Sequence, residues 1–141
     1  RPEATAESFY SDGFFRTGDT GRKDPDGRVT IVGRSKDLII SGGFNVYPAE
    51  VEILLAEVAG VVDVAVFGVP HPDFGEAVVA AVTVDGPDFD VAALEAAAAA
   101  NLARFKQPKA IHVLPELPRN AMGKVVKTEL RKRYGDSFTA Q

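Results

Sequence analysis

The chain has 141 residues, of which 45% are hydrophobic and 26% are charged, and it contains no cysteine. This composition is ordinary for a globular protein, and the absence of cysteine excludes disulfides and thiolate metal sites. No run of about 18 apolar residues occurs, so no membrane span is expected. The formal net charge of −4 argues against extensive nucleic-acid binding. These features are compatible with a cytoplasmic protein, which is the localisation we expect.

The charge is unevenly distributed along the chain. Residues 1–101 carry 7 Lys or Arg and 17 Asp or Glu, whereas residues 102–134 carry 9 and 2. A segment this basic is either a solvated face or a surface that meets phosphates. The sequence opens on Arg1-Pro2-Glu3 rather than on an initiator methionine. We therefore expect a fragment or a cleaved piece of a longer protein.

The first part of the chain is predicted to form hairpins. A short helix end is expected at residues 4–8. The turn signal at residues 24–27 predicts strand, turn and strand over residues 13–33. A second hairpin is predicted over residues 37–47, where Gly42-Gly43 interrupts two short apolar runs.

The rest of the chain is predicted to form a compact α+β unit. Helices are predicted at residues 48–58, 91–102 and 127–134, and strands at residues 61–69, 77–84 and 110–114. Pro48 suits a first helical turn, Asp90 could cap a helix, and Pro70 should end the first strand because proline lacks an N–H. The tail after Gly135 is expected to be loose. A domain boundary is expected near residues 34–37, because the first segment cannot form a core alone.

Asp19 and Arg34 are candidates for contact with a sugar or a phosphate. Asp19 follows Gly18 at the end of a predicted strand, and its carboxylate could accept two hydrogen bonds from ribose hydroxyls. Taken alone, the residue is better explained as an ordinary turn aspartate. Arg34 stands beside Lys36 at the expected boundary, where its guanidinium could bind ribose or phosphate oxygens. A charged linker is the alternative interpretation.

Two glycine-containing loops could contact a ligand. The segment Ser41-Gly42-Gly43-Phe44-Asn45 lacks the pattern of a phosphate-binding P-loop, but its glycines allow close approach of the backbone. A tight hairpin turn is the alternative. Lys124 follows Gly123 in a proline-rich loop and could neutralise negative charge that develops on a phosphate or a carboxylate. A lone solvated lysine is the alternative there.

The two histidines give no sign of a metal site. His71 and His112 are far apart in the sequence and lack ligand spacing, and no cysteine could complete a zinc site. We therefore predict no metal ligands in this chain, and we expect His71 to cap or pack a loop.

The order and spacing of these segments resemble the adenylate-forming (AMP-binding) superfamily over roughly residues 8–134. The matching segments are Arg16–Asp19, Gly33–Asp37, Ser41–Glu52, Gly68–Asp73, Phe105–Lys109 and Pro118–Lys124. Within the superfamily they look most similar to the C-terminal part of acyl-CoA synthetases, in particular malonyl-CoA synthetases.

The resemblance implies a fold and a division into domains. We expect an α+β fold, namely a compact C-terminal domain with a short central sheet flanked by helices. A β-hairpin of the large N-terminal adenylating domain should precede it. Residues 1–35 would be the trailing β segment of that large domain, and residues 36–141 the mobile C-terminal domain, with Lys36 as the hinge.

The resemblance also implies a two-step reaction of an AMP-forming carboxylate–CoA ligase. A small carboxylic acid, such as malonate or methylmalonate, and ATP would give an acyl-adenylate and pyrophosphate. CoA would then attack to give the thioester and AMP, after rotation of the small domain. Lys124 would be the catalytic lysine of adenylation. ATP, AMP, CoA and Mg²⁺ are the implied cofactors, with the Mg²⁺ ligands in the N-terminal domain.

Binding roles follow from the same resemblance. Asp19 and Arg34 would hold the AMP ribose. The hairpin of Gly42, Gly43 and Phe44 would enter the site for the second step, with the Gly43 backbone lining the pantetheine tunnel. The basic segment could receive the CoA phosphates, although no particular cation is indicated.

The chain departs from the family pattern in two ways. Lys36 stands where many members carry aspartate, although lysine is also used there. The phosphate loop, the acyl pocket and the adenine pocket are missing, so the isolated fragment is expected to be inactive. Lys124 is also a candidate for acetylation by a GNAT-type acetyltransferase, which would remove its charge.

Two alternatives remain open. One is an adenylation domain that loads a carrier protein. The other is a non-catalytic interaction module that uses the basic helix at residues 127–134.

Overall fold

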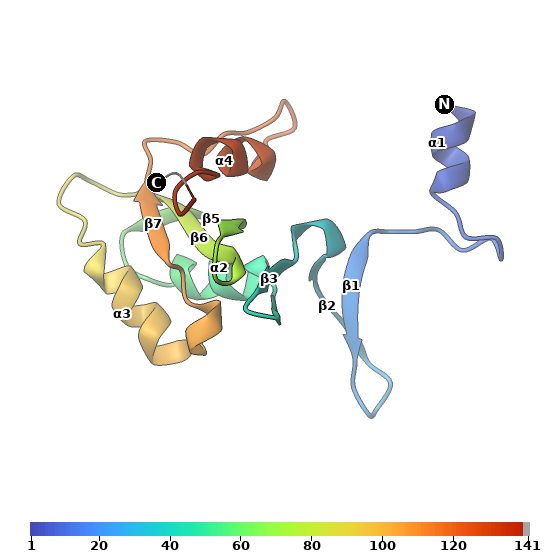
Figure 1. Ribbon diagram of the computed structural model, residues 1–141, viewed down its shortest axis with the longest axis horizontal. Coiled ribbons are helices and arrows are strands. Elements are labelled where there is room, and N and C mark those ends of the chain that lie inside the picture. Colours follow the sequence, from blue (N-terminus) through green and yellow to red (C-terminus); the bar gives the residue numbers. More distant parts are fainter. Residues whose placement is uncertain (140–141) are drawn as a thin grey trace. The chain divides into compact units, whose positions relative to one another are not determined.

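The computed structural model describes residues 1–139 and contains two compact units, Arg1–Lys36 and Asp37–Gln141 (Figure 1). Residues 140–141 lie outside the described part. Each unit is considered by itself below. None of the helices within residues 1–139 has the length and apolar composition needed to cross a membrane.

The first unit is a helix followed by an antiparallel strand pair. Its elements are α1 (Pro2–Glu7), β1 (Asp19–Lys23) and β2 (Val29–Arg34). The predicted turn between the strands is confirmed, since the Asp24 carboxylate accepts a hydrogen bond from the Arg28 N–H at 2.9 Å. No residue of this unit is buried, so the strand pair has no core of its own.

The first strand of the hairpin predicted over residues 13–33 begins later than expected, at Asp19. The preceding backbone turns back on itself: the Gly13 N–H donates to the Tyr10 carbonyl, and the Tyr10 N–H donates to the Phe14 carbonyl. Phe15 therefore makes only an isolated bridge with Phe9. The aromatic residues that suggested a strand form a local loop instead.

The second unit is built on a five-stranded sheet with the order β4-β3-β6-β5, in which β7 pairs in parallel with β6. Its strands are β3 (Ile39–Ser41), β4 (Phe44–Val46), β5 (Val61–His71), β6 (Gly75–Val84) and β7 (Ala110–Val113). Its helices are α2 (Pro48–Ala56), α3 (Ala92–Asn101) and α4 (Lys127–Tyr134). This arrangement confirms the predicted α+β fold.

Helices cover both faces of this sheet, as Figure 1 shows. On one face, Val66, Ala80 and Val82 pack with residues of α2 and α3. On the other face, Phe67, Val79 and Ala81 pack with Leu130 of α4. Successive strand residues point to opposite faces, so the valine-rich runs of β5 and β6 supply two cores at once.

Strand β5 is an edge strand, which corrects the expectation that Pro70 would end it. The strand continues to His71, and Pro70 pairs in register with Glu76. Proline is tolerated at a sheet edge, where no neighbouring strand needs its missing N–H. Two carboxylates accept hydrogen bonds from other β5 amides: Asp63 from Val64 at 3.0 Å and Glu52 from Val66 at 2.9 Å.

Several local predictions can be compared with the structure. The Asp90 carboxylate accepts a hydrogen bond from the Ala92 N–H at 3.0 Å, as expected of a residue at a helix start. The ring of His71 packs a loop, because its Nδ1 accepts hydrogen bonds from the Asp73 and Phe74 N–H groups. The tail is not loose at Phe138, which packs against the α4 side of the sheet.

Candidate functional site

The loop that carries Lys124 is closed by its own polar groups. The Asn120 carboxamide oxygen accepts hydrogen bonds from the N–H groups of Met122 at 2.9 Å and Lys124 at 3.0 Å. The Asn120 N–H donates to the Lys124 carbonyl at 2.9 Å, and Arg119 bridges to Val125. The Lys124 side chain is exposed at the end of this closed loop. None of the ion pairs within the described residues includes it.

An arginine joins this loop to the sheet. The Arg119 guanidinium forms an ion pair with Asp63 on β5, 56 residues earlier in the chain. The same guanidinium donates to the carbonyl of Gly123 at 2.6 Å, directly before Lys124. The loop is thus connected to the start of β5 through side chains as well as through the backbone.

The glycine-rich segment is the predicted hairpin between β3 and β4. Ser41 pairs with Phe44, which leaves Gly42 and Gly43 as a two-residue turn with φ values of 58° and 82°. Positive φ at both positions is the requirement of a type I′ turn and favours glycine. The turn displays the Phe44 ring, which is 56% exposed.

The hairpin is attached to the opposite end of the β5–β6 pair. The Gly42 N–H donates to the Phe74 carbonyl at 2.9 Å, and the Glu76 carboxylate accepts from the Ile40 N–H at 2.8 Å. Gly68 makes room for this carboxylate, since a Cβ at Gly68 would lie 2.6 Å from Glu76 Oε1. Glu76 replaces a ladder hydrogen bond where β3 pairs with β6 only at Ser41 and Gly75.

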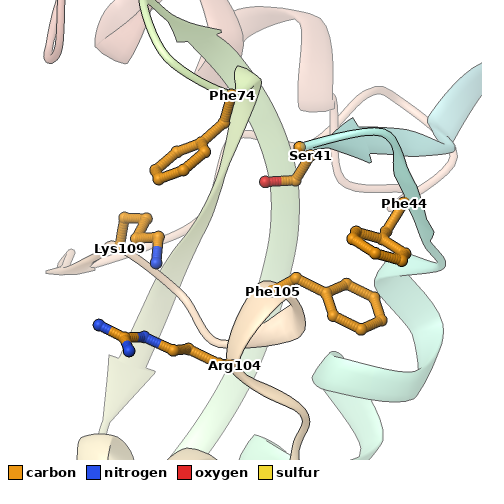
Figure 2. A pocket seen from close by; sticks show the side chains of 7 residues that line it. Ser41, Phe44, Phe74, Arg104, Phe105 and Lys109 are labelled. Carbon is orange, nitrogen blue, oxygen red and sulfur yellow. The ribbon is translucent and has the colours of Figure 1, made fainter.

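Beside the hairpin lies an open cavity of about 330 Å³ with aromatic and cationic walls. Its lining residues are Ser41, Gly42, Phe44, Phe74, Arg104, Phe105 and Lys109. Figure 2 shows Arg104 and Lys109 on one side with Phe74, and Phe44 and Phe105 on the other. The rings of Phe44 and Phe105 stack at 4.6 Å, and the Lys109 ammonium lies 5.3 Å from the centre of the Phe74 ring. Such walls suit a ligand that combines a flat ring with phosphates.

The Lys124 loop and this cavity are not one site. Asp63, which holds the loop, lies near the start of β5, and His71, beside the hairpin, ends it. A strand rises about 3.3 Å per residue, so these two anchors are separated by roughly 26 Å. The structure therefore brings Gly42, Gly43 and Phe44 together and leaves Lys124 at the other end of the strand.

The remaining predicted residues belong to the first unit or to its end. Asp19 pairs with Arg34 in the β1–β2 register, and the Asp19 carboxylate lies 3.4 Å from Arg34 Nε. The Arg34 guanidinium also donates to the Thr17 carbonyl at 3.1 Å, which fixes its orientation. Lys36 is the last residue of the unit and lies in a short 3-10 turn, Ser35–Asp37.

His112 combines a lowered pKa with a buried side-chain nitrogen that has no hydrogen-bond partner among the described residues. Its ring stacks on Tyr134 at 3.9 Å, and its Nε2 has no hydrogen-bond partner. Burial, and secondarily the charge of Arg133, lower the pKa of His112 below its ordinary value of 6.5. The residue belongs to the contact between α4 and the sheet rather than to either loop.

Sequence reasoning missed the residues that hold the two loops and most of the cavity wall. Asp63 and Glu76 act through partners distant in the chain. Phe74 and Arg104 line a cavity whose walls come from separate segments. Local sequence patterns indicate neither kind of role. The motif Phe105–Lys109 was a usable signal, since both of its end residues line the cavity. No group of three or more potential metal-binding side chains gathers among residues 1–139.

Comparisons with known proteins identify the family of this chain. Residues 50–124 match the family described as AMP-binding enzyme C-terminal domain. The chain is 45% identical over 134 residues to the long-chain-fatty-acid–CoA ligase FadD13 of Mycobacterium tuberculosis (strain ATCC 25618 / H37Rv), covering 95% of the chain and 26% of that relative.

Solved structures give the same result. The ATP-bound crystal structure of MatB from Rhodopseudomonas palustris matches with a TM-score of 0.87 and 50% identity, over 98% of this chain and 28% of that one. The o-succinylbenzoate CoA synthetase MenE of Bacillus subtilis, in complex with the acyl-adenylate intermediate OSB-AMP, matches with a TM-score of 0.85 and 36% identity, over 93% and 27%. The chain thus spans about a quarter of the length of the relatives it matches. It belongs to the AMP-binding enzyme C-terminal domain family, and it is homologous to the acyl-CoA ligases.

Proposed function

We propose that this chain is the C-terminal part of an AMP-forming carboxylate–CoA ligase and serves both half-reactions with opposite ends of one strand pair. In the first half-reaction, a carboxylate oxygen attacks the α-phosphate of ATP and pyrophosphate leaves. In the second, the CoA thiol attacks the acyl carbon, loses its proton, and AMP leaves. The observation that carries this proposal is the separation of roughly 26 Å between the anchors of the Lys124 loop and of the hairpin.

The Lys124 loop and the hairpin are too far apart to act together on one bound adenylate. A rotation of the second unit would bring Lys124 to the adenylate site first and the hairpin afterwards, as in enzymes that work by domain closure and reopening. Under this proposal, residues 1–35 are the trailing β segment of the large domain. Lys36 is then the hinge, and residues 36–141 form the mobile domain. The lack of any buried residue in the first unit supports its dependence on chain outside these residues.

Lys124 has the properties that the adenylation step requires. It is exposed, and its ammonium is not neutralised by a carboxylate among the described residues. A positive charge placed between the substrate carboxylate and the α-phosphate stabilises the negative charge that grows there in the transition state. Mg²⁺ would accompany ATP, and the proposal assigns its ligands to the large domain.

Asp19 and Arg34 are proposed to hold the AMP ribose. A carboxylate can accept hydrogen bonds from two vicinal hydroxyls, and the guanidinium beside it would orient the carboxylate. The hydrogen bond from Arg34 to the Thr17 carbonyl supports a pre-formed arrangement.

The cavity beside the hairpin is proposed to receive the nucleotide end of CoA. Phe105 and Phe44 would form the apolar wall for the adenine, while Arg104 and Lys109 would meet the phosphates. The Gly43 backbone would then line the path of the pantetheine arm. Dephospho-CoA, which lacks the 3′-phosphate, tests the cations. In the natural protein, the KM for dephospho-CoA should exceed the KM for CoA. The substitution Lys109→Ala should raise the KM for dephospho-CoA little further.

For the acyl substrate, we propose a malonyl- or methylmalonyl-type acid. This choice rests on the resemblance of the motifs to malonyl-CoA synthetases, since the acyl pocket lies outside this chain. Relatives named for a long-chain fatty acid and for o-succinylbenzoate also match it. A panel of these acids, offered to the full-length enzyme, would identify the acid that it adenylates most efficiently.

The full-length enzyme also separates the remaining alternatives. Release of pyrophosphate with a carboxylate, followed by formation of a CoA thioester, is the expected outcome. Thioester formation on a carrier protein alone would favour a carrier-loading domain, and no adenylation of any acid would leave an interaction module. The isolated 141-residue chain is expected to show neither half-reaction.

We also propose that Lys124 is a target of a GNAT-type acetyltransferase. The loop projects its lysine together with Met122, which is 81% exposed, so an enzyme could reach the amine. Acetylation would remove the charge on which adenylation depends. Incubation with acetyl-CoA and a cognate acetyltransferase should label Lys124, as read by mass spectrometry, and an unlabelled Lys124 would reject the idea.

A further inference from the structure

Asp63 lies at the centre of a chain of polar contacts that begins on the sheet and ends at Lys124. One carboxylate oxygen accepts the Val64 N–H at the open edge of β5 at 3.0 Å, and the other forms the ion pair with Arg119. Arg119 in turn donates to the Gly123 carbonyl at 2.6 Å. Both oxygens of Asp63 are therefore engaged, one with the scaffold and one with the loop.

The loop needs such an external anchor because its internal bonds do not determine where it stands. The contacts of Asn120 close the loop on itself and would persist if the whole loop tilted. Leu117 at the entry of the loop is buried in the α4-side core, and Val125 at its exit packs against the same core, so both residues hold the base of the loop. The Arg119 guanidinium is the described group that ties the far part of the loop to another element.

The Asp63–Arg119 pair is too exposed to matter much for stability. The side chains are 32% and 45% exposed, and ion pairs in such positions contribute little to the free energy of folding. The planar guanidinium of Arg119, however, contacts Asp63 and the Gly123 carbonyl at once, which the point charge of a lysine cannot reproduce. The pair thus suits a geometric role better than a stabilising one.

We propose that Asp63 is a positioning residue for adenylation, which acts by holding the Lys124 loop at a fixed angle to the sheet. The inference rests on the proposed role of Lys124. It adds a residue that the resemblance did not point to and that touches no substrate. Because a displacement of about 1 Å can cost on the order of a hundredfold in rate, loss of the anchor should be felt in adenylation.

The test compares both half-reactions in full-length enzymes carrying single substitutions. Asp63→Asn keeps the shape of the side chain and removes its charge, and we expect adenylation to fall roughly tenfold to a hundredfold. Thioester formation from a synthetic acyl-adenylate should stay within about twofold, and Tm should be nearly unchanged. Arg119→Lys, which keeps the charge but not the two-pronged contact, should show the same selective loss.

Glu50→Gln is the matched control. It removes an acid from a comparably exposed ion pair, with Lys106 at 2.9 Å, on helix α2. It should leave adenylation unchanged. Asp63→Asn and Arg119→Lys variants that adenylate as fast as Glu50→Gln would overturn the proposal. So would an equal loss in both half-reactions together with a lower Tm, because that pattern indicates a general folding defect.

A separate measurement distinguishes this inference from the proposed function. Lys124→Ala tests the role of the lysine, and if it adenylates normally, the proposed function fails. The anchor is then judged in the 141-residue chain by the backbone amide chemical shifts of Gly123 and Lys124. Asp63→Asn should move both shifts, whereas Glu50→Gln should not. Unmoved shifts in Asp63→Asn would overturn the anchor whatever Lys124 does.

Discussion

The Lys124 loop and the Gly42–Phe44 hairpin occupy opposite ends of the same strand pair and are held by different means. The loop is held by polar groups, since an asparagine closes it and an ion pair anchors it. The hairpin has a type I′ glycine turn, a carboxylate that stands in for a ladder bond, and stacked rings. One region suits the delivery of a charge, and the other suits a wall for a bulky ligand.

This difference fits the proposed use of one small sheet in two reaction steps. A single charged group must be held at a defined position, and directional hydrogen bonds fix positions well. A wall must exclude water and match a shape, which packing achieves. The following predictions test whether the two ends are as independent as this comparison implies.

The largest effect is expected for Lys124→Ala in the full-length enzyme. Loss of one transition-state donor costs about 2–4 kcal/mol, so adenylation should fall roughly 30- to 1,000-fold. Thioester formation from a synthetic acyl-adenylate should be nearly spared, because the lysine stands at the other end of the strand pair. Pyrophosphate release and thioester assays measure the two halves. Equal losses in both would contradict the division of labour.

The next effect is expected at the cavity wall. Phe105→Ala removes the ring that stacks on Phe44, and an aromatic wall for a base contributes about 1–3 kcal/mol. The KM for CoA should therefore rise about 5- to 150-fold, while adenylation, measured without CoA, should stay constant. Steady-state titration of CoA provides the measurement. A change in adenylation without a change in the KM for CoA would contradict the assignment of the cavity to CoA binding.

A smaller effect, on stability, is expected for Gly68→Ala. The added Cβ would lie 2.6 Å from Glu76 Oε1 and 3.1 Å from Ile39 Cγ2, so the Glu76 carboxylate must shift from the position in which it accepts the Ile40 N–H. Such overpacking costs about 1–3 kcal/mol, and each kcal/mol lowers Tm by roughly 4–8 °C in a domain of this size class.

A double substitution identifies the cause. In a Glu76→Ala background, Gly68→Ala should cost less than it does alone, because part of the clash is gone. Thermal unfolding of the natural chain, the two single variants and the double variant gives the coupling free energy between the two positions. Strict additivity would show that Gly68 and Glu76 do not act through each other.

The smallest effect concerns pH and lies outside both loops. The pKa of His112 is lowered by burial and by Arg133, so the unfolded chain binds a proton more readily than the folded chain. The contribution of neutral His112 is fully present above the unfolded value near 6.5, and it is lost as the pH falls from there toward the lower folded pKa. His112→Phe keeps a ring against Tyr134 and should weaken this acid-side loss in urea unfolding. An unchanged pH profile would exclude His112 as its source.

Local patterns predicted the elements of this fold well where neighbouring residues decide the outcome. Pro48 marks the first turn of α2 as expected, and the basic helix spans Lys127–Tyr134 as predicted. The two-residue glycine turn at Gly42 and Gly43 was likewise predicted from residue types alone. In these cases backbone preference and capping are properties of the segment itself.

Apart from the late start of the first strand, which a local turn causes, the failures arise where distant partners decide the outcome. The prediction that Pro70 ends a strand is wrong, because the place of Pro70 at the sheet edge depends on strand pairing, which composition does not reveal. The contacts from Glu76 to Ile40 and from Asp63 to Arg119 join residues 36 and 56 positions apart. Periodicity predicts which residues face a core, but it does not predict which side chains meet across the fold.

The open edge of β5 has a consequence for the behaviour of the domain in concentrated solution. An uncovered strand edge is a template to which another copy can add its own strand, the first step toward aggregation. Here proline withholds a donor, and Asp63 and Glu52 occupy the amides of Val64 and Val66. The carboxylate that we propose to position the lysine loop would therefore also hinder strand pairing between copies of the domain. A substitution at Asp63 that left the fold intact would still free the Val64 N–H to pair with another copy along this edge.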